Sequence, residues 1–185
     1  MNRDYRLFLD MDGVLVDYQG GYHKLARSVK KGDVEHEKWE NAVSDAYFNA
    51  GGEFWANLDW LYGGEELWKA STGLFEHVYI LSSTGASSLE WSNLVAGGKL
   101  AWLKKHIPEM NMENVFIVNG KHLKPHFADK MSILVDDVGL TIQRWNRAGG
   151  FGILHNFRHY RKTIETLEDI SRPIKLKELV KRIRR

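Results

Sequence analysis

Residues 7–17 read Leu7-Phe8-Leu9-Asp10-Met11-Asp12-Gly13-Val14-Leu15-Val16-Asp17, so a short apolar run leads into two aspartates and a glycine. Such a run is typical of a buried parallel strand followed by its exit loop. Ligands of open α/β sheets bind at the carboxyl ends of the strands, and Asp10 ends this strand. Asp12 follows at the spacing that returns an extended backbone to the same side. Gly13 permits a turn and a close approach of a ligand to the backbone.

This stretch resembles motif I of the haloacid dehalogenase (HAD) superfamily, which has the form DxDGVLxD. The resemblance implies that Asp10 is the nucleophile for a phosphoryl group, that Asp12 is the general acid and base, and that Mg²⁺ is held beside Asp10. A carboxylate that attacks a phosphate forms an aspartyl-phosphate, and the leaving oxygen then needs a proton from a separate acid. The alternative is that the two aspartates only end a strand in a solvated turn.

The composition is that of an ordinary globular protein. A length of 185 residues suits one domain with at most a small insertion. The net charge of +2 is too small to indicate a nucleic-acid partner, and the absence of cysteine excludes disulfides and thiolate metal sites. No apolar run approaches the ~20 residues of a membrane span, and we see no signal peptide. We therefore expect a cytoplasmic protein without a membrane partner.

The segment after the first strand has a helical pattern. Apolar residues recur at helical spacing over residues 22–29, and a second helix is predicted over residues 35–50. Two helices at this place resemble the small helical cap that many HAD phosphatases carry after their first strand. We predict a cap over residues 18–57 and a core over residues 1–17 and 58–185.

Phe54 and Trp55 follow a Gly-Gly pair near the expected site, where aromatic rings can stack on a planar base. In the 5'(3')-deoxyribonucleotidase branch of the superfamily, a Gly-Phe-Phe segment supplies the stacking ring. The stretch Gly52-Glu53-Phe54-Trp55 is similar but has one extra residue, which leaves open which of the two rings stacks, if either does. The alternative is that these aromatic residues are packing residues.

A second buried strand, residues 77–81, ends at Ser82-Ser83-Thr84-Gly85. This end resembles HAD motif II, which implies that Ser82 hydrogen-bonds a phosphoryl oxygen and that Ser83 is an adjacent donor. The nucleotidase pattern has a proline where this chain has Thr84-Gly85. The alternative is a group of helix N-cap residues. A helix is predicted over residues 98–107, and we interpret its nucleotidase-like stretch from Lys99 to His106 as packing and not as chemistry.

Three lysines follow the third predicted strand, residues 114–118, at positions 121, 124 and 130. HAD motif III needs one lysine to neutralise the charge between the nucleophile and the phosphate. Lys124 fits best, because related sequences have a lysine, two further residues, an aromatic residue and an alanine, as in Lys124-Pro125-His126-Phe127-Ala128. Lys121 is the second choice, and Lys130 is interpreted as a surface residue.

The fourth predicted strand ends in Asp136-Asp137, which resembles HAD motif IV. The resemblance implies that Asp136 binds Mg²⁺ and that Asp137 supports it, with the Asp10 carboxylate and the Asp12 backbone carbonyl as further ligands. Mg²⁺ prefers such hard oxygen ligands. Carboxylates crowded at two strand ends destabilise a fold unless a cation lies between them, so the two acidic motifs support each other.

The rest of the chain continues this layout. Residues 151–155 are predicted as the last strand, and residues 163–185 have a helical pattern with a basic end. The segment from Asp136 to His155 resembles small nucleotidase-like HAD proteins, many of them encoded by phages. The sequence leaves open whether His155 or His159 faces the site.

We therefore predict an α/β fold, a three-layer Rossmann-like HAD domain with a parallel central sheet. The predicted reaction is Mg²⁺-dependent hydrolysis of a phosphate monoester through an aspartyl-phosphate, with a 5'-(deoxy)nucleotide as substrate. One alternative is a HAD phosphatase that acts on sugar phosphates or polynucleotide ends. Another is a non-catalytic HAD-like module that binds a nucleotide or a partner.

Overall fold

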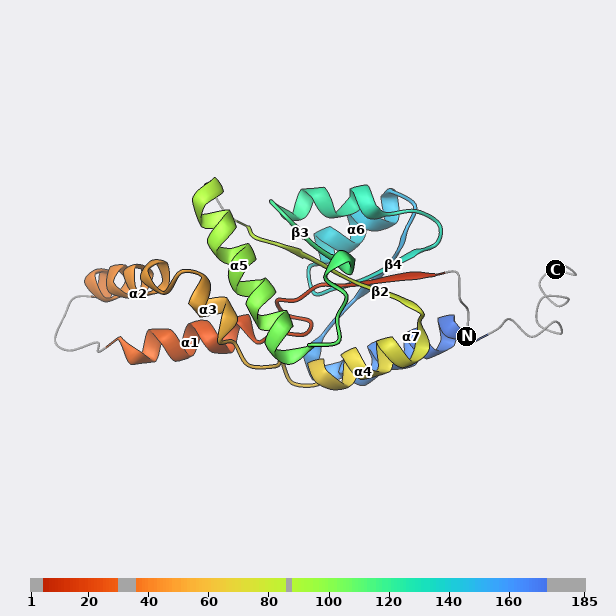
Figure 1. Cartoon of the computed structure of the whole chain (residues 1–185), viewed down its shortest axis with the longest axis horizontal. Helices are drawn as coiled ribbons and strands as arrows, with labels where there is room; N and C mark the ends of the chain where they lie inside the picture. The colour runs from red at the N-terminus through yellow and green to blue at the C-terminus, as the bar shows by residue number, and fades with distance from the viewer. Residues whose placement is uncertain (1–4, 30–35, 86–87, 173–185) are drawn as a thin grey trace, which may run out of the picture.

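The computed structural model describes residues 5–29, 36–85 and 88–172. Its centre is a parallel five-stranded sheet in the order β3-β2-β1-β4-β5 (Figure 1). The strands are β1 (Arg6–Leu9), β2 (His77–Ser83), β3 (Val115–Val118), β4 (Ser132–Asp136) and β5 (Phe151–Leu154). The sequence prediction of a parallel α/β sheet is confirmed, with the strand of the Asp-x-Asp stretch at its centre.

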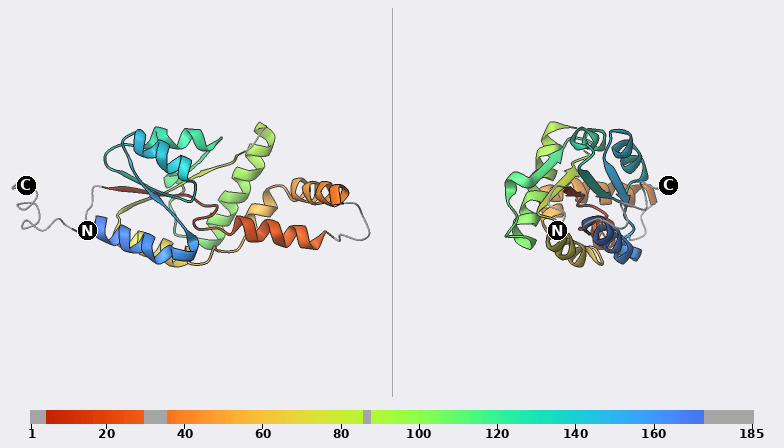
Figure 2. Two further views of the ribbon diagram at one scale, coloured as in Figure 1. Left: turned by 180° about the vertical axis from the view of Figure 1, so that it is seen from behind. Right: turned by 90° about the vertical axis from the view of Figure 1, so that its right-hand side faces the viewer.

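Helices cover both faces of the sheet and its carboxyl-terminal edge. The α-helices are α1 (Tyr18–Ser28), α2 (His36–Ala50), α3 (Gly52–Ala56), α4 (Gly64–Leu74), α5 (Leu89–His106), α6 (Gly139–Arg147) and α7 (Tyr160–Ser171). Short 3-10 helices are η1 (Met112–Asn114), η2 (Lys121–Phe127) and η3 (Phe157–His159). Figures 1 and 2 show α4 and α7 side by side on one face, with α6 on the opposite face.

The central strand is buried on both faces, which explains its continuous apolar run. Leu7 and Leu9 belong to the larger core, which includes residues of α4, α5 and α7. Phe8 points to the other face and packs in a second core with Trp145 of α6. The alternation of side chains along β1 therefore builds the three layers, helix, sheet and helix.

One helix differs from its predicted bounds. The sequence predicts a helix over residues 98–107, but α5 begins at Leu89. The side chain of Ser88 caps it by accepting a hydrogen bond from the Trp91 backbone N–H at 3.2 Å. The glycine pair at positions 97 and 98 lowers helix propensity, but the helix continues through it. Gly98 lies where α5 packs closely against α3.

Part of the predicted tail helix is also present. The helix α7 runs from Tyr160 to Ser171, and the remainder of the predicted helix, residues 173–185, lies outside the described residues. Within the described part of the chain, none of the helices combines the length and the apolar character needed to cross a membrane.

The first helices lie beyond the carboxyl ends of the strands. Figure 1 shows α1 and α2 projecting from the sheet at this end, with α3 leading back toward α5. The contact between α3 and α5 is a close approach of two backbones. A Cβ atom on Gly98 would lie 2.1 Å from the Gly52 carbonyl oxygen, and one on Gly52 would lie 2.7 Å from the Leu94 carbonyl oxygen. The division into a cap and a core stays a proposal.

The two neighbouring glycines of α5 give a matched test of this contact. We expect Gly98→Ala to lower the free energy of unfolding by about 1–3 kcal/mol, because its methyl group must displace α3. A Cβ on Gly97 meets nothing within 4 Å, so Gly97→Ala should instead raise stability by up to about 1 kcal/mol through helix propensity. Urea denaturation of both variants measures the difference, and equal effects would contradict the close packing of α3 on α5.

Candidate active site

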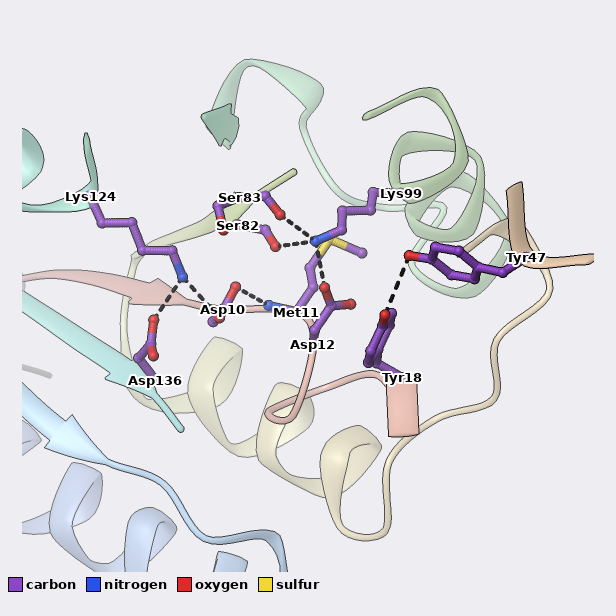
Figure 3. Close-up of polar contacts among 10 residues, drawn as sticks. All are labelled: Asp10, Met11, Asp12, Tyr18, Tyr47, Ser82, Ser83, Lys99, Lys124 and Asp136. Carbon is purple, nitrogen blue, oxygen red and sulfur yellow. Dashed lines mark hydrogen bonds and ion pairs between the residues drawn. The ribbon is translucent and has the colours of Figure 1, made fainter. Parts of the chain in front are cut away.

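The strand ends bring the predicted acidic residues together. Leu9 of β1 pairs with Val135 of β4, and each is followed in the chain by an aspartate. The Asp10 backbone N–H donates to the Val135 carbonyl at 3.0 Å, so the pairing continues to this point. Asp10 and Asp136 therefore lie side by side at the carboxyl ends of the strands, as Figure 3 shows.

A cavity of about 1020 Å³ opens over these strand ends. The sheet contributes carboxylates and hydroxyls, and the first helices contribute aromatic rings. Among the residues that line it are Asp10, Asp12, Asp137, Ser82, Ser83, Thr84, Tyr18, Tyr47, Trp55, Trp91, Lys121 and His155. The floor is therefore polar, and the wall formed by α1, α2, α3 and α5 is aromatic.

A buried lysine joins the two strand-end aspartates. The Lys124 ammonium group lies 2.8 Å from Asp10 Oδ2 and 2.7 Å from Asp136 Oδ2, and all three residues are buried. Burial alone would lower the pKa of Lys124, but the two carboxylates outweigh it and raise the pKa. Of the three lysines considered in the sequence, the structure places Lys124 between the carboxylates, Lys121 exposed at the cavity, and Lys130 exposed outside its lining.

The carboxylates that surround this lysine differ in acidity. Burial raises the pKa of Asp10, but the Lys124 and Lys99 ammonium groups outweigh burial and hold that pKa below its ordinary value. Burial and the neighbouring Asp10 raise the pKa of Asp136. Burial of the carboxylate, together with Asp10 and Asp136, raises the pKa of Asp137 to about 6. Negative charge at this side of the cavity therefore exceeds what Lys124 alone neutralises.

Three of these carboxylates can hold a metal ion. One oxygen from each of Asp10, Asp136 and Asp137 lies within 4.8 Å of the others. All are hard oxygen donors of the kind that Mg²⁺ prefers. Gly13 leaves room for Asp137, because a Cβ at position 13 would lie 2.3 Å from Asp137 Oδ2. Its φ of +77° also favours glycine there. The donor set fits a divalent cation.

A second buried lysine, Lys99 of α5, is a residue that we did not predict as functional. Its ammonium group donates to Asp12 Oδ2 at 2.7 Å, to Ser82 Oγ at 2.8 Å and to the Ser83 carbonyl at 2.8 Å (Figure 3). The interpretation of its segment as packing is therefore incomplete. Lys99 lies four residues after Val95 and three before Trp102, on the buried stripe of the helix. A charged residue within an apolar stripe was the signal that could have identified it.

The predicted hydroxyl residues border the cavity at the end of β2. Ser82 is fully buried and Ser83 nearly so, and both line the cavity. Because Lys99 donates to Ser82 Oγ, the Ser82 hydroxyl hydrogen is free to donate to another group. Thr84 extends this polar edge and contacts Ser92 Oγ at 2.9 Å. The structure thus brings hydroxyl donors to the same end of the sheet as the carboxylates.

The two predicted stacking residues lie in different surroundings. Trp55 lines the cavity, whereas Phe54 packs behind it in the aromatic cluster and is not among the lining residues. Both side chains are buried. Tyr18 and Tyr47, together with Trp91 of α5, complete the aromatic wall beside Trp55. The structure therefore leaves Trp55 as the one of the two that borders the cavity.

The two histidines near the end of the sheet differ in their position relative to the cavity. His155 is buried and lines the cavity, and its Nδ1 lies 3.0 Å from Thr163 Oγ1. Burial lowers the pKa of His155 to about 4, so the imidazole is neutral at physiological pH. His159 is exposed and is not among the lining residues.

Comparison of the sequence with known proteins gives no match, either to a family model or to a curated protein. Comparison of the structure with solved structures gives matches. A haloacid dehalogenase-like family hydrolase from Xanthomonas campestris superposes with a TM-score of 0.55 and 10% sequence identity, over 91% of this chain and 94% of that one.

Two other solved structures are less similar. A HAD hydrolase of family IA, variant 3, from Entamoeba histolytica has a TM-score of 0.48 and 12% identity, covering 90% of this chain and 99% of its own. A HAD family hydrolase from Deinococcus radiodurans, solved with bound phosphate and sodium, has a TM-score of 0.47 and 14% identity, covering 90% and 96%. The Xanthomonas structure shows that this chain has the Rossmann-like fold of HAD-like hydrolases.

Proposed function

We propose that the protein is a Mg²⁺-dependent phosphate monoester hydrolase of the HAD superfamily that works through an aspartyl-phosphate at Asp10. The observation that carries the proposal is the position of Asp10. Its carboxylate borders the cavity at a strand end, accepts from the Met11 backbone N–H at 2.8 Å, and pairs with Lys124 at 2.8 Å. The HAD-like fold supports this reading.

Asp10 is suited to nucleophilic attack. The lowered pKa of its carboxyl keeps it ionised at neutral pH. The hydrogen bonds to both of its oxygens hold its orientation toward the cavity. In the proposed first step an Asp10 oxygen forms a bond to phosphorus while the bond from phosphorus to the leaving alcohol oxygen breaks.

Asp12 is the proposed acid and base. Its Oδ2 pairs with Lys99, whereas its Oδ1 has no hydrogen-bond partner within the described residues. Oδ1 can therefore carry the proton that goes to the leaving alcohol oxygen. In the second step the same carboxylate takes a proton from the water that attacks phosphorus, and the bond between phosphorus and Asp10 breaks to release inorganic phosphate.

The phosphoryl oxygens need donors and positive charge. The free hydrogen of the Ser82 hydroxyl and the Ser83 side chain are the proposed donors, and Lys124 and Lys121 contribute charge at the cavity. Asp10, Asp136 and Asp137 would hold Mg²⁺, with the Asp12 carbonyl as a further ligand. A bound Mg²⁺ supplies positive charge that stabilises the transferring phosphoryl group.

The proposed substrate is a 5'-(deoxy)nucleoside monophosphate. The cavity volume of about 1020 Å³ is ample for a ligand of this size, and Trp55 lies in its aromatic wall together with Tyr18, Tyr47 and Trp91. Aromatic rings near a phosphate site suit a planar base. The burial of Phe54 away from the cavity favours a second candidate, a HAD phosphatase for sugar phosphates, because one of the two predicted stacking rings is unavailable to a ligand.

We expect Mg²⁺-dependent phosphate release from nucleoside monophosphates, and loss of this release in a chelator or on Asp10→Asn. An amide cannot act as the nucleophile, so the rate should fall by at least about 10⁴-fold. The assay compares nucleoside monophosphates with sugar phosphates and phosphorylated oligonucleotide ends. Asp45→Asn, at an exposed aspartate of α2, is the control and should keep full activity.

The ranking of these esters distinguishes the two candidate functions. Faster release from nucleotides supports a nucleotidase, and faster release from sugar phosphates supports the second candidate. Absence of release from every ester would contradict the hydrolase and favour a non-catalytic binding module.

Lys99 gives a test of the arrangement around Asp12. We expect Lys99→Met to lower kcat by about 10²–10³-fold, because the ammonium group holds Asp12 and Ser82 in their positions. The double variant Lys99→Met, Asp12→Asn should be no slower than Asp12→Asn alone, since both changes disable the same unit. Lys104→Met, at an exposed position of the same helix, is the control. Additive losses in steady-state kinetics would show that Lys99 acts independently of Asp12.

A further inference from the structure

Two phenol groups from different helices meet beside Asp12. Tyr18 begins α1 and Tyr47 lies near the end of α2, and their hydroxyl oxygens are 3.3 Å apart. Both residues line the cavity. Figure 3 shows the two hydroxyls turned toward each other next to the Asp12 carboxylate, on the side away from Asp10 and Lys124. The roles assigned above to the catalytic residues do not use this pair.

Aromatic packing fixes both rings. Tyr18 contacts the rings of Phe54 and Trp55 at centroid distances of 5.7 and 6.3 Å. Tyr47 contacts the same two rings at 5.0 and 5.4 Å. A phenol held between neighbouring rings keeps its hydroxyl in one place. The pair is therefore a preorganised polar point within the aromatic wall.

The pair can both donate and accept. Burial, the contact with Tyr18 and the charge of Asp12 raise the pKa of Tyr47, so its phenol stays neutral. Of the two O–H groups, one donates within the pair, and the other remains free to donate to a third group. The oxygens retain lone pairs that can accept a hydrogen bond. A hydroxyl group, which is itself a donor and an acceptor, is the complementary ligand.

The position of the pair indicates which hydroxyl it would bind. In an in-line displacement the leaving oxygen lies opposite the attacking oxygen. Asp12 is the proposed proton donor to that oxygen, and Tyr18 and Tyr47 lie beside Asp12 on the side of the cap helices. The part of the substrate nearest the two phenols is therefore the carbon skeleton of the leaving alcohol.

We propose that Tyr18 and Tyr47 form a hydroxyl-recognition subsite for the leaving alcohol, so that the enzyme prefers phosphate esters whose alcohol carries a further hydroxyl near the ester oxygen. This inference rests on the proposed function, because the reaction at Asp10 defines the leaving alcohol. For a nucleotide the recognised group is a hydroxyl of the sugar. When an ester without that hydroxyl occupies the cavity, the free phenol O–H loses water and gains no partner.

The test measures kcat/KM for a ribonucleoside 5'-monophosphate and its 2'-deoxy, 3'-deoxy and 2',3'-dideoxy analogues. For the unsubstituted protein, we expect kcat/KM to be about 10–100-fold higher for at least one hydroxylated ester than for the dideoxy analogue. In Tyr47→Phe this ratio should fall toward one, mainly through slower turnover of the hydroxylated ester. Tyr18→Phe should act in the same direction.

Tyr79→Phe is the matched control. Tyr79 lies on β2, stacks on Phe8 in the second core and is not among the cavity-lining residues, so its variant should keep the natural ratio. The Phe variants retain the rings of the aromatic cluster, and circular dichroism checks that they fold. Two results would overturn the subsite. One is an active unsubstituted protein with equal kcat/KM for the hydroxylated and dideoxy esters, and the other is a kcat/KM ratio that is unchanged in both Tyr18→Phe and Tyr47→Phe. An absence of phosphate release from these nucleotides and also from sugar phosphates and phosphorylated oligonucleotide ends would instead overturn the proposed function itself.

Discussion

The ion pairs of Lys124 with Asp10 and Asp136 are the interactions on which the rest of the site depends. Adjacent parallel strands place two carboxylates side by side in a buried position, where like charges repel strongly. Lys124 Nζ lies within 2.8 Å of both and makes this arrangement compatible with folding. A buried charge without its partner destabilises a protein by about 3–5 kcal/mol, so the lysine and the two aspartates form one structural unit.

Positive charge is distributed between two sides of the cavity. Lys124 serves the carboxylates of β1 and β4, and Lys99 serves Asp12 and the end of β2. The four carboxylates at positions 10, 12, 136 and 137 still outnumber these two buried ammonium groups, and burial together with Asp10 and Asp136 raises the pKa of Asp137. A divalent cation beside Asp10 would correct the imbalance. The close contact of Gly52 with Gly98 holds α5 against α3, and Lys99 follows Gly98 in α5.

The strands and their acidic ends could be predicted from the sequence because each is a local pattern, a short apolar run that stops at Asp or Ser. Lys124 was chosen among three lysines by its resemblance to motif III, and only the structure shows that its side chain turns inward between Asp10 and Asp136. Lys99 was missed because a helical pattern was interpreted as packing, although a charged residue on the buried stripe was visible. The contact of Tyr18 with Tyr47 joins residues of two different helices, α1 and α2, and no spacing in the sequence predicts it.

The most direct test of the account is to trap a phosphoryl group on Asp10. The variant Asp12→Asn, supplied with Mg²⁺ and an aryl phosphate whose leaving group needs no proton, should complete the first step and stall before water attacks. After acid quenching, peptide mass spectrometry should find one phosphoryl group on the peptide that contains Asp10, and none in Asp10→Asn. Release of the aryl alcohol without a phosphorylated peptide, or a phosphoryl group on another residue, would contradict the mechanism.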